Sequence, residues 1–326
     1  MSDSFRLTDI LDRFTSPSVP DYGKYEAEVD DYFWDTSKNT CLQLGDLSKY
    51  PLLYVGEGHN TIYLINDGKI IWKYDTGKGY ELDDIWMLSN GNILFTHMYW
   101  CAGITPEKDQ YWYYKVPEGC EVHALQPIGL DKVAMIQNGK EPKVIIMDTA
   151  TNAVEYEHVI PYDPDLPIHS QFRRMRITKD GNFLICYMDM HKVVEFDREF
   201  NIVWQYETER PWSASRLLNG NTLITDETLE KVIEVNPSKE TVWEFSLDQI
   251  DEKHRLIGSQ SCVRLENGNT ILCSQGNYGE GPQLVEVTKD KKTVWCVNDW
   301  EKLGPATTIQ VLSEKGIPEI PGECQR

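Results

Sequence analysis

Short runs of alternating apolar and polar residues recur along this chain, and many of them flank a turn that contains Asn-Gly or Asp-Gly. Alternation with a period of two is the pattern of a half-buried β-strand. Asn-Gly between two such runs predicts a hairpin, because both central residues of a two-residue type I′ turn need positive φ. The pattern occurs at residues 87–95, 177–185, 217–224 and 265–272, with a degenerate copy at 127–135. The sequence therefore predicts a series of repeated β-hairpins.

A second pattern, a short strand that contains an aromatic residue, follows the hairpins. The aromatic residue is Trp in five copies and Tyr in one, at positions 72, 112, 156, 204, 243 and 295. The spacings between these positions are 40, 44, 48, 39 and 52 residues. A four-strand repeat of about 40 to 50 residues is typical of a β-propeller blade. We therefore expect six blades, with the repeated aromatic residues serving as packing residues of the scaffold.

The two ends of the repeated region complement each other. The first repeat has only three predicted strands, at 52–55, 61–64 and 70–72, whereas the last leaves a spare strand at 308–312. Pairing the spare strand with the first repeat would close the ring and remove exposed sheet edges. We therefore predict an all-β, six-bladed β-propeller closed by its C-terminal strand, with an open sandwich as the alternative.

The predicted organisation has three parts. An irregular, acidic and Tyr-rich N-terminal arm covers residues 1–50, the propeller covers 51–312, and a C-terminal tail covers 313–326.

Two strings carry a resemblance to a known fold family, namely Arg-Leu-Leu-Asn-Gly-Asn-Thr-Leu-Ile and Glu-Thr-Val-Trp-Glu-Phe. They resemble the hairpin and outer-strand repeats of the quinoprotein-like and arylsulfotransferase-like propeller superfamily, and the resemblance covers residues 52–312. The resemblance implies a propeller architecture. Quinone binding and sulfuryl transfer follow from it only by analogy, because such propellers host many unrelated functions.

Charge and composition narrow the possible partners. The chain has 326 residues and a formal net charge of −20, which disfavours general binding to nucleic acid. No apolar run approaches the roughly 20 residues that a membrane-spanning helix needs. The N-terminus lacks the basic and apolar regions of a signal peptide. At face value this predicts the cytoplasm; a leader removed before residue 1 would instead allow a periplasmic or surface-exposed protein.

Alignment of the six inner strands on their turns brings polar residues to two levels. The level nearest the turns contains Met87, Gln126, Arg176, Arg216, Arg264 and Gln310. Three residues earlier, the level contains Asp84, His123, Arg173, Ser213, Ser261 and Thr307. Arginine recognises carboxylate, sulfate or phosphate through planar, bidentate contacts. We therefore interpret the arginine column, Arg176, Arg216 and Arg264, as ligand contacts. The alternative is that the arginines tie neighbouring blades together through carbonyls or acidic side chains.

Aromatic residues in the long loops and connectors give a second indication of a site. They are Tyr99, Trp100, Tyr187, Trp212 and Tyr278. Exposed rings there would suit stacking on a sugar or an aromatic ligand. The alternative is that these rings cover the ends of the blade interfaces.

Motifs of several common enzymes and cofactor sites are missing from the sequence. It contains no P-loop, no Gly-x-Ser-x-Gly elbow and no His-Glu-x-x-His. The seven histidines show no paired spacing, so neither a metal site nor another cofactor is predicted. If the chain is an enzyme, His123 and His169 are the candidates for nucleophile or base.

The eight cysteines leave the redox compartment open. Cys101 with Cys120, and Cys41 with Cys324, are possible disulfide pairs. Cys262 and Cys273 are predicted to face each other across a hairpin, in a geometry poor for a disulfide. Buried free thiols are the interpretation for Cys186 and Cys296.

These observations predict a protein that binds a small anionic or glycan-like ligand, such as a polysaccharide fragment or a ferric chelate, at the axial mouth. The predicted contacts are Asp84, Tyr99, Trp100, His123, Arg173, Arg176, Trp212, Arg216, Arg264 and Gln310. One alternative is an enzyme of lyase or sulfotransferase type that uses the same site. The other is a protein-interaction platform. The sequence leaves open which of these holds, and in what oligomeric state.

Overall fold

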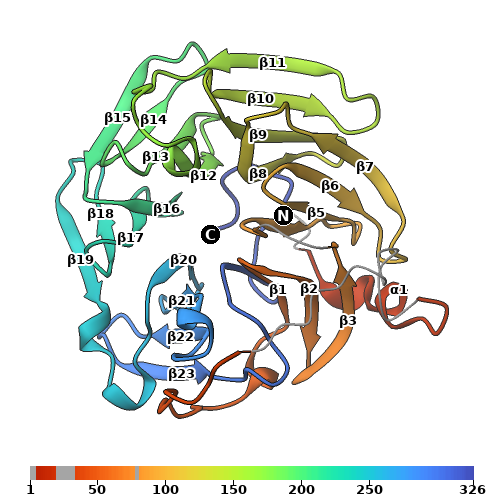
Figure 1. Cartoon of the computed structure of the whole chain (residues 1–326), viewed down its shortest axis with the longest axis vertical. Coiled ribbons are helices and arrows are strands. Elements are labelled where there is room, and N and C mark those ends of the chain that lie inside the picture. Colours follow the sequence, from red (N-terminus) through yellow and green to blue (C-terminus); the bar gives the residue numbers. More distant parts are fainter. Residues whose placement is uncertain (1–4, 20–33, 78–80) are drawn as a thin grey trace.

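The computed structural model describes residues 5–19, 34–77 and 81–326, so residues 1–4 and 20–33 of the predicted arm and 78–80 of the first connector lie outside the described residues. Within the described part, the strands form six four-stranded antiparallel sheets that surround a common axis (Figure 1). The prediction of an all-β, six-bladed β-propeller is confirmed.

The blades are numbered in chain order, and the strands of each blade are given from the axis outwards. Blade 1 contains β24 (Thr308–Val311), β1 (Leu52–Gly56), β2 (His59–Asn66) and β3 (Lys69–Asp75). Blade 2 contains β4 (Ile85–Met87), β5 (Ile93–Thr96), β6 (Trp100–Ile104) and β7 (Gln110–Lys115). Blade 3 contains β8 (Glu121–Ile128), β9 (Lys132–Asn138), β10 (Lys143–Asp148) and β11 (Val154–Val159).

The second half of the ring has the same order. Blade 4 contains β12 (Phe172–Ile177), β13 (Phe183–Tyr187), β14 (Lys192–Phe196) and β15 (Ile202–Glu207). Blade 5 contains β16 (Pro211–Arg216), β17 (Thr222–Asp226), β18 (Lys231–Val235) and β19 (Thr241–Ser246). Blade 6 contains β20 (Ser259–Arg264), β21 (Thr270–Ser274), β22 (Leu284–Val287) and β23 (Thr293–Val297).

The helices of the described residues are all short. They are η1 (Leu7–Asp9), α1 (Leu11–Thr15), η3 (Leu47–Lys49), η4 (Ile168–Ser170), η5 (Leu247–Gln249), η6 (Glu252–His254) and η7 (Gly276–Tyr278). None of them has the length and apolar character needed to cross a bilayer.

The C-terminal strand closes the ring, as predicted. β24 pairs with β1 in an antiparallel register that places Leu52 opposite Val311 and Val55 opposite Thr308. Blade 1 is therefore built from both ends of the repeated region, and the pairing removes an exposed sheet edge.

The Asn-Gly and Asp-Gly turns contain three residues rather than two. In the loop 89–91, Leu88 N–H donates to the carbonyl of Asn92, and Gly91 N–H donates to the carbonyl of Leu88. Of the three loop residues only Gly91 has positive φ, at 87°. The loops 179–181, 218–220 and 266–268 repeat this arrangement. The predicted two-residue turn is therefore wrong; the residue before Gly keeps an ordinary φ and Gly alone supplies the left-handed conformation.

This longer turn shifts the register expected for one pair of cysteines. Cys262 lies opposite Leu272, not opposite Cys273 as predicted. All eight cysteines, each within the described residues, are free thiols, so the disulfide pairs considered from sequence are not formed.

Two tryptophans of the aromatic column of the outer strands bond to the following blade. The Trp72 indole donates to the carbonyl of Pro106 at 2.9 Å, and the Trp243 indole donates to the carbonyl of Lys289 at 2.9 Å. Both acceptors lie in the turn between the third and fourth strands of the following blade. These contacts agree with the packing role expected of the column.

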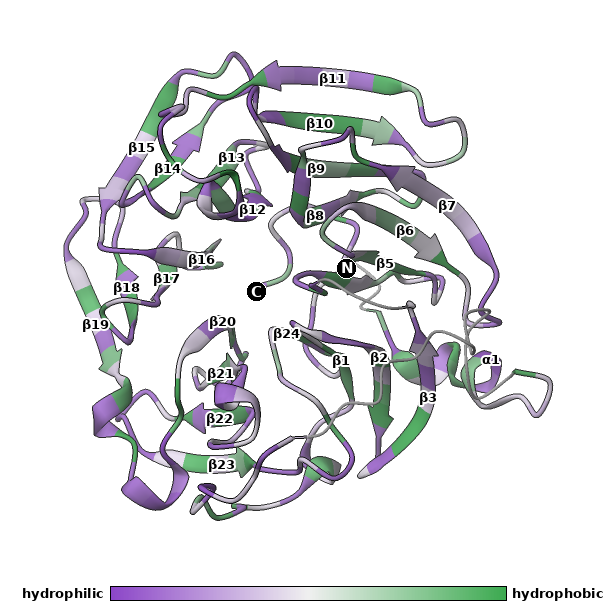
Figure 2. Cartoon of the chain, in the orientation of Figure 1, coloured by the Kyte–Doolittle hydropathy of each residue, from purple (hydrophilic) through white to green (hydrophobic). Residues whose placement is uncertain are grey.

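The two ends of the axis differ. We call the end with the three-residue turns the turn face, and the opposite end, with the blade connectors and the loops between second and third strands, the connector face. The tail after β24 covers the turn face, where Gly129 N–H donates to Glu319 and Arg264 N–H donates to Gln325 (Figure 1). Figure 2 shows hydrophilic residues on the axial strand β12 as well as on the outer strands β7 and β11. Polar groups therefore line the axis inside an otherwise apolar blade core.

Candidate functional site

Irregular pairing at the start of the inner strands determines which side chains reach the axis. In β8 the pairing with β9 shifts at His123, and in β12 the shift with β13 includes Arg173 and Arg174. A β-bulge interrupts the strict alternation of side chains. The consecutive residues Arg173 and Arg174 accordingly both contact groups near the axis, although they enter different clusters.

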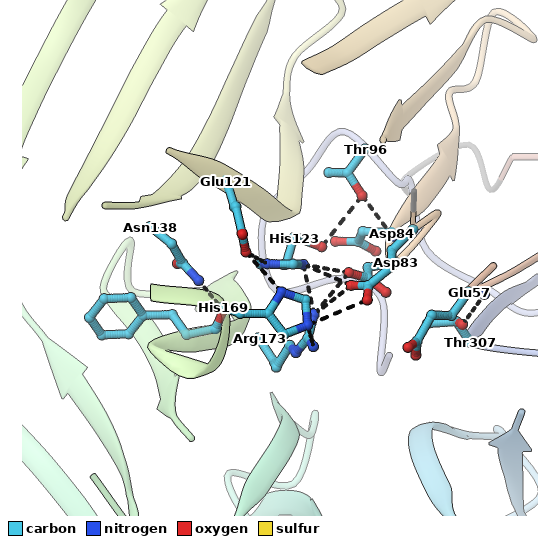
Figure 3. Close-up of polar contacts among 12 residues, drawn as sticks. Glu57, Asp83, Asp84, Thr96, Glu121, His123, Asn138, His169, Arg173 and Thr307 are labelled. Atoms are coloured by element: carbon cyan, nitrogen blue, oxygen red, sulfur yellow. Dashed lines mark hydrogen bonds and ion pairs between the residues drawn. The ribbon is translucent and has the colours of Figure 1, made fainter. Parts of the chain in front are cut away.

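Six titratable side chains meet at the connector-face end of the axis, and all of them except Glu81 are labelled in Figure 3. We call this set the mouth cluster, and it consists of Glu81, Asp83, Glu121, His123, His169 and Arg173. Three blades contribute: the connector before β4, the first residues of β8, and η4 with β12. The structure thus brings together His123, His169 and Arg173, which the sequence singled out, with three carboxylates that it did not.

The guanidinium of Arg173 lies at the centre of the mouth cluster. Its Nη1 is 2.9 Å from Glu81 Oε2 and 3.3 Å from Asp83 Oδ2. The same Nη1 lies 2.8 Å from His123 Nδ1, and Nη2 lies 2.6 Å from His169 Nε2. An arginine can only donate, so each of these contacts is a hydrogen bond only when the imidazole is neutral and the nitrogen that faces Arg173 carries a lone pair.

A single carboxylate oxygen orients both imidazoles. Glu121 Oε2 lies 3.0 Å from His123 Nε2 and 2.9 Å from His169 Nδ1. Because the carboxylate accepts, both of these nitrogens carry a proton. In the neutral imidazoles the lone pairs are then on His123 Nδ1 and His169 Nε2, the atoms that face Arg173. Asp83 Oδ2 also lies 2.6 Å from His123 Nδ1, so two neighbours compete for that one nitrogen.

Burial and charge shift the acidities at the mouth in opposite directions. Burial, with the nearby charges of Asp83 and Glu81, raises the pKa of Glu57 to about 8. Burial acts in the same direction on Glu121, but the hydrogen bonds from His123 and His169 outweigh it and lower the pKa of Glu121 to about 2. Hydrogen bonds to Glu121 and Glu81 raise the pKa of His169 to about 9, so below that pH the imidazolium predominates, and its Nε2 lies 3.4 Å from Glu81 Oε1. Such opposite shifts are common where acid–base chemistry or ion binding occurs, although structural ion pairs also cause them.

The mouth cluster reaches solvent through one of its imidazoles. The His169 side chain is 39% exposed, whereas that of His123 is fully buried. A ligand that approaches from the connector face therefore meets His169 first.

Asp84 and Arg176 lie deeper along the axis and bind each other. Asp84 Oδ2 is 2.7 Å from Arg176 Nη1, and Asp84 Oδ1 is 2.6 Å from Arg174 Nη1. Burial alone would raise the pKa of Asp84, but the guanidinium groups of Arg174 and Arg176 lower it. Trp212 is buried beneath Arg174, with 5.0 Å between the guanidinium carbon and the ring centroid. These three predicted ligand contacts thus form an internal ion cluster, where Trp212 is not an exposed ring.

Arg216 and Arg264 pair with acidic residues of the preceding blade. Arg264 Nη1 is 2.8 Å from Glu234 Oε2, and its guanidinium carbon stacks 5.1 Å from the ring centroid of Trp243. Arg216 forms the same contacts with Glu195 and with Trp204. This arrangement corresponds to the alternative considered from sequence, in which arginines tie blades together.

Gln310 also ties two blades. Its Oε1 accepts from Met87 N–H at 2.8 Å, and its Nε2 donates to the Met87 carbonyl at 3.2 Å. The bond therefore crosses from β24 in blade 1 to β4 in blade 2.

The predicted aromatic residues differ in their surroundings. Trp100 stacks on His97 with 4.3 Å between centroids, and Tyr99 packs against the apolar core between blades 2 and 3. Tyr187 is buried against Phe172. Tyr278 is 39% exposed on the connector face, and a φ of 52° places this bulky residue in the left-handed region. A conformation of that kind is often retained at functional sites.

Sequence reasoning missed Glu57, Glu81, Asp83 and Glu121. Glu121 stands two residues before His123, and Asp83 directly precedes Asp84. The two-residue spacing of Glu121 and His123 could have indicated that their side chains lie on the same face of one strand. Nothing in the periodic pattern indicated Glu57 or Glu81, because both lie in loops outside the repeated strands.

Comparison with known proteins supports the fold. No protein-family model matches the chain, and no protein of curated function matches it by sequence. A solved structure of a protein of unknown function from Bacteroides caccae is similar, with a TM-score of 0.71 and 25% identity over 80% of this chain and 97% of that one.

Two lyase structures are similar at lower identity. One is a catalytically inactive virginiamycin B lyase from Staphylococcus aureus with quinupristin, with a TM-score of 0.56 and 12% identity over 81% of this chain and 90% of that one. The other is a streptogramin B lyase, with a TM-score of 0.56 and 13% identity over 82% of this chain and 88% of that one. These matches do not single out the quinoprotein-like and arylsulfotransferase-like superfamily. The chain is a six-bladed β-propeller.

Proposed function

We propose that the connector face binds a hydroxyl-rich, glycan-like ligand across the mouth cluster and a neighbouring row of aromatic rings. The observation that carries this proposal is the placement of carboxylate acceptors beside stacked aromatic rings at the end of the axis that the tail does not cover. Sugar rings present both hydroxyl donors and apolar faces, so they complement such a surface.

The aromatic row starts at Tyr278 and continues to the rim. The ring of Trp34 stacks on that of Tyr278 with 6.2 Å between centroids and an angle of 14°, and it lies 5.4 Å from Trp300. Trp34 and Trp300 line a groove of about 580 Å³. A Cβ atom on Gly58 would lie 3.8 Å from the phenol oxygen of Tyr278, so this phenol lies beside the loop that carries Glu57.

The charge balance favours a glycan over a simple anion. The guanidinium groups of Arg173, Arg176, Arg216 and Arg264 are each paired with a carboxylate. An anion that bound to the arginine column would have to break these pairs and leave acidic side chains without partners, at a cost of several kcal/mol for each buried pair. Carboxylates of the mouth cluster can instead accept hydrogen bonds from sugar hydroxyls.

A lyase is the second candidate, favoured by the contact of Arg173 with His169 at the exposed end of the mouth cluster. In that reaction Arg173 exchanges one of its carboxylate partners for the uronic carboxylate, and the minor fraction of His169 that is neutral below about pH 9 takes the α-proton. The electron pair forms the new double bond and expels the glycosidic oxygen. Glu57, protonated below about pH 8, supplies a proton to that oxygen.

The test is a calorimetric titration of the full chain with neutral and uronate-containing oligosaccharides. We expect saturable binding that Tyr278→Ala weakens about tenfold, which corresponds to about 1.4 kcal/mol. Tyr113→Ala is the matched control, since Tyr113 is 38% exposed but lies on the outer strand β7. A binder returns the glycan intact, whereas a lyase forms an unsaturated uronate that absorbs ultraviolet light. The absence of a response to every oligosaccharide would contradict the proposal and favour an interaction platform.

A further inference from the structure

We propose that Glu81, His123 and His169 form a site for a divalent first-row metal ion, with Zn²⁺ as the ion that the ligand set suits best. The proposal rests on the proposed function, because the same cluster would contact the glycan. A bound ion would add a point of attachment for sugar hydroxyl or carboxylate oxygens.

The ligand atoms already converge. One atom from each of the three residues lies within 4.8 Å of the others, although the residues come from three separate segments of the chain. Small side-chain rotations would let one ion contact all three. Two imidazoles and a carboxylate are a ligand set of catalytic and binding zinc sites, which keep a further position open.

The surroundings of the imidazoles match those of metal ligands. Metal-bound histidines usually donate their second ring N–H to a carboxylate, which fixes the tautomer and the ring orientation. Glu121 Oε2 accepts from both His123 and His169. The remaining nitrogens, His123 Nδ1 and His169 Nε2, therefore face inward, where they contact Arg173.

A second and independent observation concerns Asp83. Its side chain is only 1% exposed, yet its Oδ1 has no hydrogen-bond partner among the described residues. Asp83 Oδ2 and Arg173 Nη1 both lie within hydrogen-bond distance of His123 Nδ1. In the neutral imidazole this nitrogen has a single lone pair, so it cannot bond well to both. A metal ion would resolve this conflict, because it satisfies the imidazole lone pairs and offers positive charge to the unpartnered carboxylate oxygen.

Arg173 is the internal competitor of the ion. Its guanidinium contacts the same three residues that would bind the metal. Binding of the ion therefore displaces the guanidinium, which becomes available to a carboxylate of the glycan. An ion on both imidazoles also removes their lone pairs, so the metal site and an imidazole base for a lyase exclude each other.

The experiment is a titration of the chelator-treated full chain with Co²⁺, followed by visible absorption, with Zn²⁺ as competitor. We expect one Co²⁺ per chain and displacement by Zn²⁺. His123→Ala, His169→Ala and Glu81→Gln should each weaken binding at least about tenfold, and Glu121→Gln should weaken it about 10- to 100-fold. His158→Ala on the outer strand β11 is the matched control and should leave binding unchanged. Thermal unfolding shows whether each variant is folded.

Two results would overturn the inference. One is the lack of saturable Co²⁺ binding to the unaltered chain, which needs no variant to interpret. The other is binding that persists in folded His123→Ala and His169→Ala. Arg173→Gln should bind Co²⁺ at least as tightly as the unaltered chain, because a competing cation is removed. Tenfold weaker binding would contradict the proposed displacement of the guanidinium by the ion. Glycan titration in the presence of chelator is the separate measurement: binding there with no Co²⁺ uptake would refute the metal site and leave the proposed function standing.

Discussion

Two surroundings of guanidinium groups in this propeller contrast with each other. Arg216 and Arg264 lie between blades, each paired with a glutamate of the preceding blade and stacked on a tryptophan. Arg173 lies at the mouth, where it contacts imidazoles as well as carboxylates. Only the second kind has a neighbour that is substantially exposed, the 39% exposed His169. Residue type alone does not separate the two kinds; the surrounding acidic and aromatic side chains do.

The arginines between blades should therefore affect stability and not ligand binding. Arg264→Met removes the partner of Glu234, whose side chain is 7% exposed, and should lower the free energy of unfolding by about 2 to 4 kcal/mol. Denaturant unfolding measures this change. The double variant Arg264→Met/Glu234→Gln should recover part of the loss, because no buried charge is then left alone. Loss of glycan binding with unchanged stability would show instead that Arg264 contacts the ligand.

At the scale of elements, periodicity was sufficient to predict the strands, the blade count and closure by β24. Periodicity gave a wrong strand register where a loop or a strand contains one residue more than the regular pattern. The loop 266–268 is one residue longer than a type I′ turn, which moved Cys262 from Cys273 to Leu272. The bulge in β12 aims both Arg173 and Arg174 toward the axis, against simple alternation. Such local irregularities leave no trace in an alternating pattern, because they depend on the pairing of two strands.

The blade-to-blade bond of Gln310 gives a prediction at the same scale. Gln310→Ala leaves the Met87 N–H and carbonyl without their partner in a buried strand, and each unsatisfied group costs about 1 to 3 kcal/mol. We expect the free energy of unfolding to fall by about 2 to 4 kcal/mol in denaturant titrations. Gln205→Ala on the outer strand β15 should change it by less than about 0.5 kcal/mol, as is usual for surface substitutions. Equal effects of the two variants would show that the axial bond adds nothing to ring closure.

For the whole molecule, the ring assembles a site that no stretch of sequence contains. Blade strands repeat, so His123 and Arg173 could be placed near the axis from their positions in the repeat. Glu81 and His169 lie in connectors of different length and composition, and their convergence follows only from the closed three-dimensional ring. The tail covers the turn face, which leaves the connector face as the end where these groups meet solvent.

The most direct test of this account is amide hydrogen exchange of the full chain with and without a saturating oligosaccharide found in the titration. The account predicts slower exchange in the connector-face segments 57–60, 81–84, 168–171 and 276–281. It predicts no change in the turn-face loops 89–91, 179–181, 218–220 and 266–268. Protection of the turn-face loops, with the connector face unaffected, would contradict it.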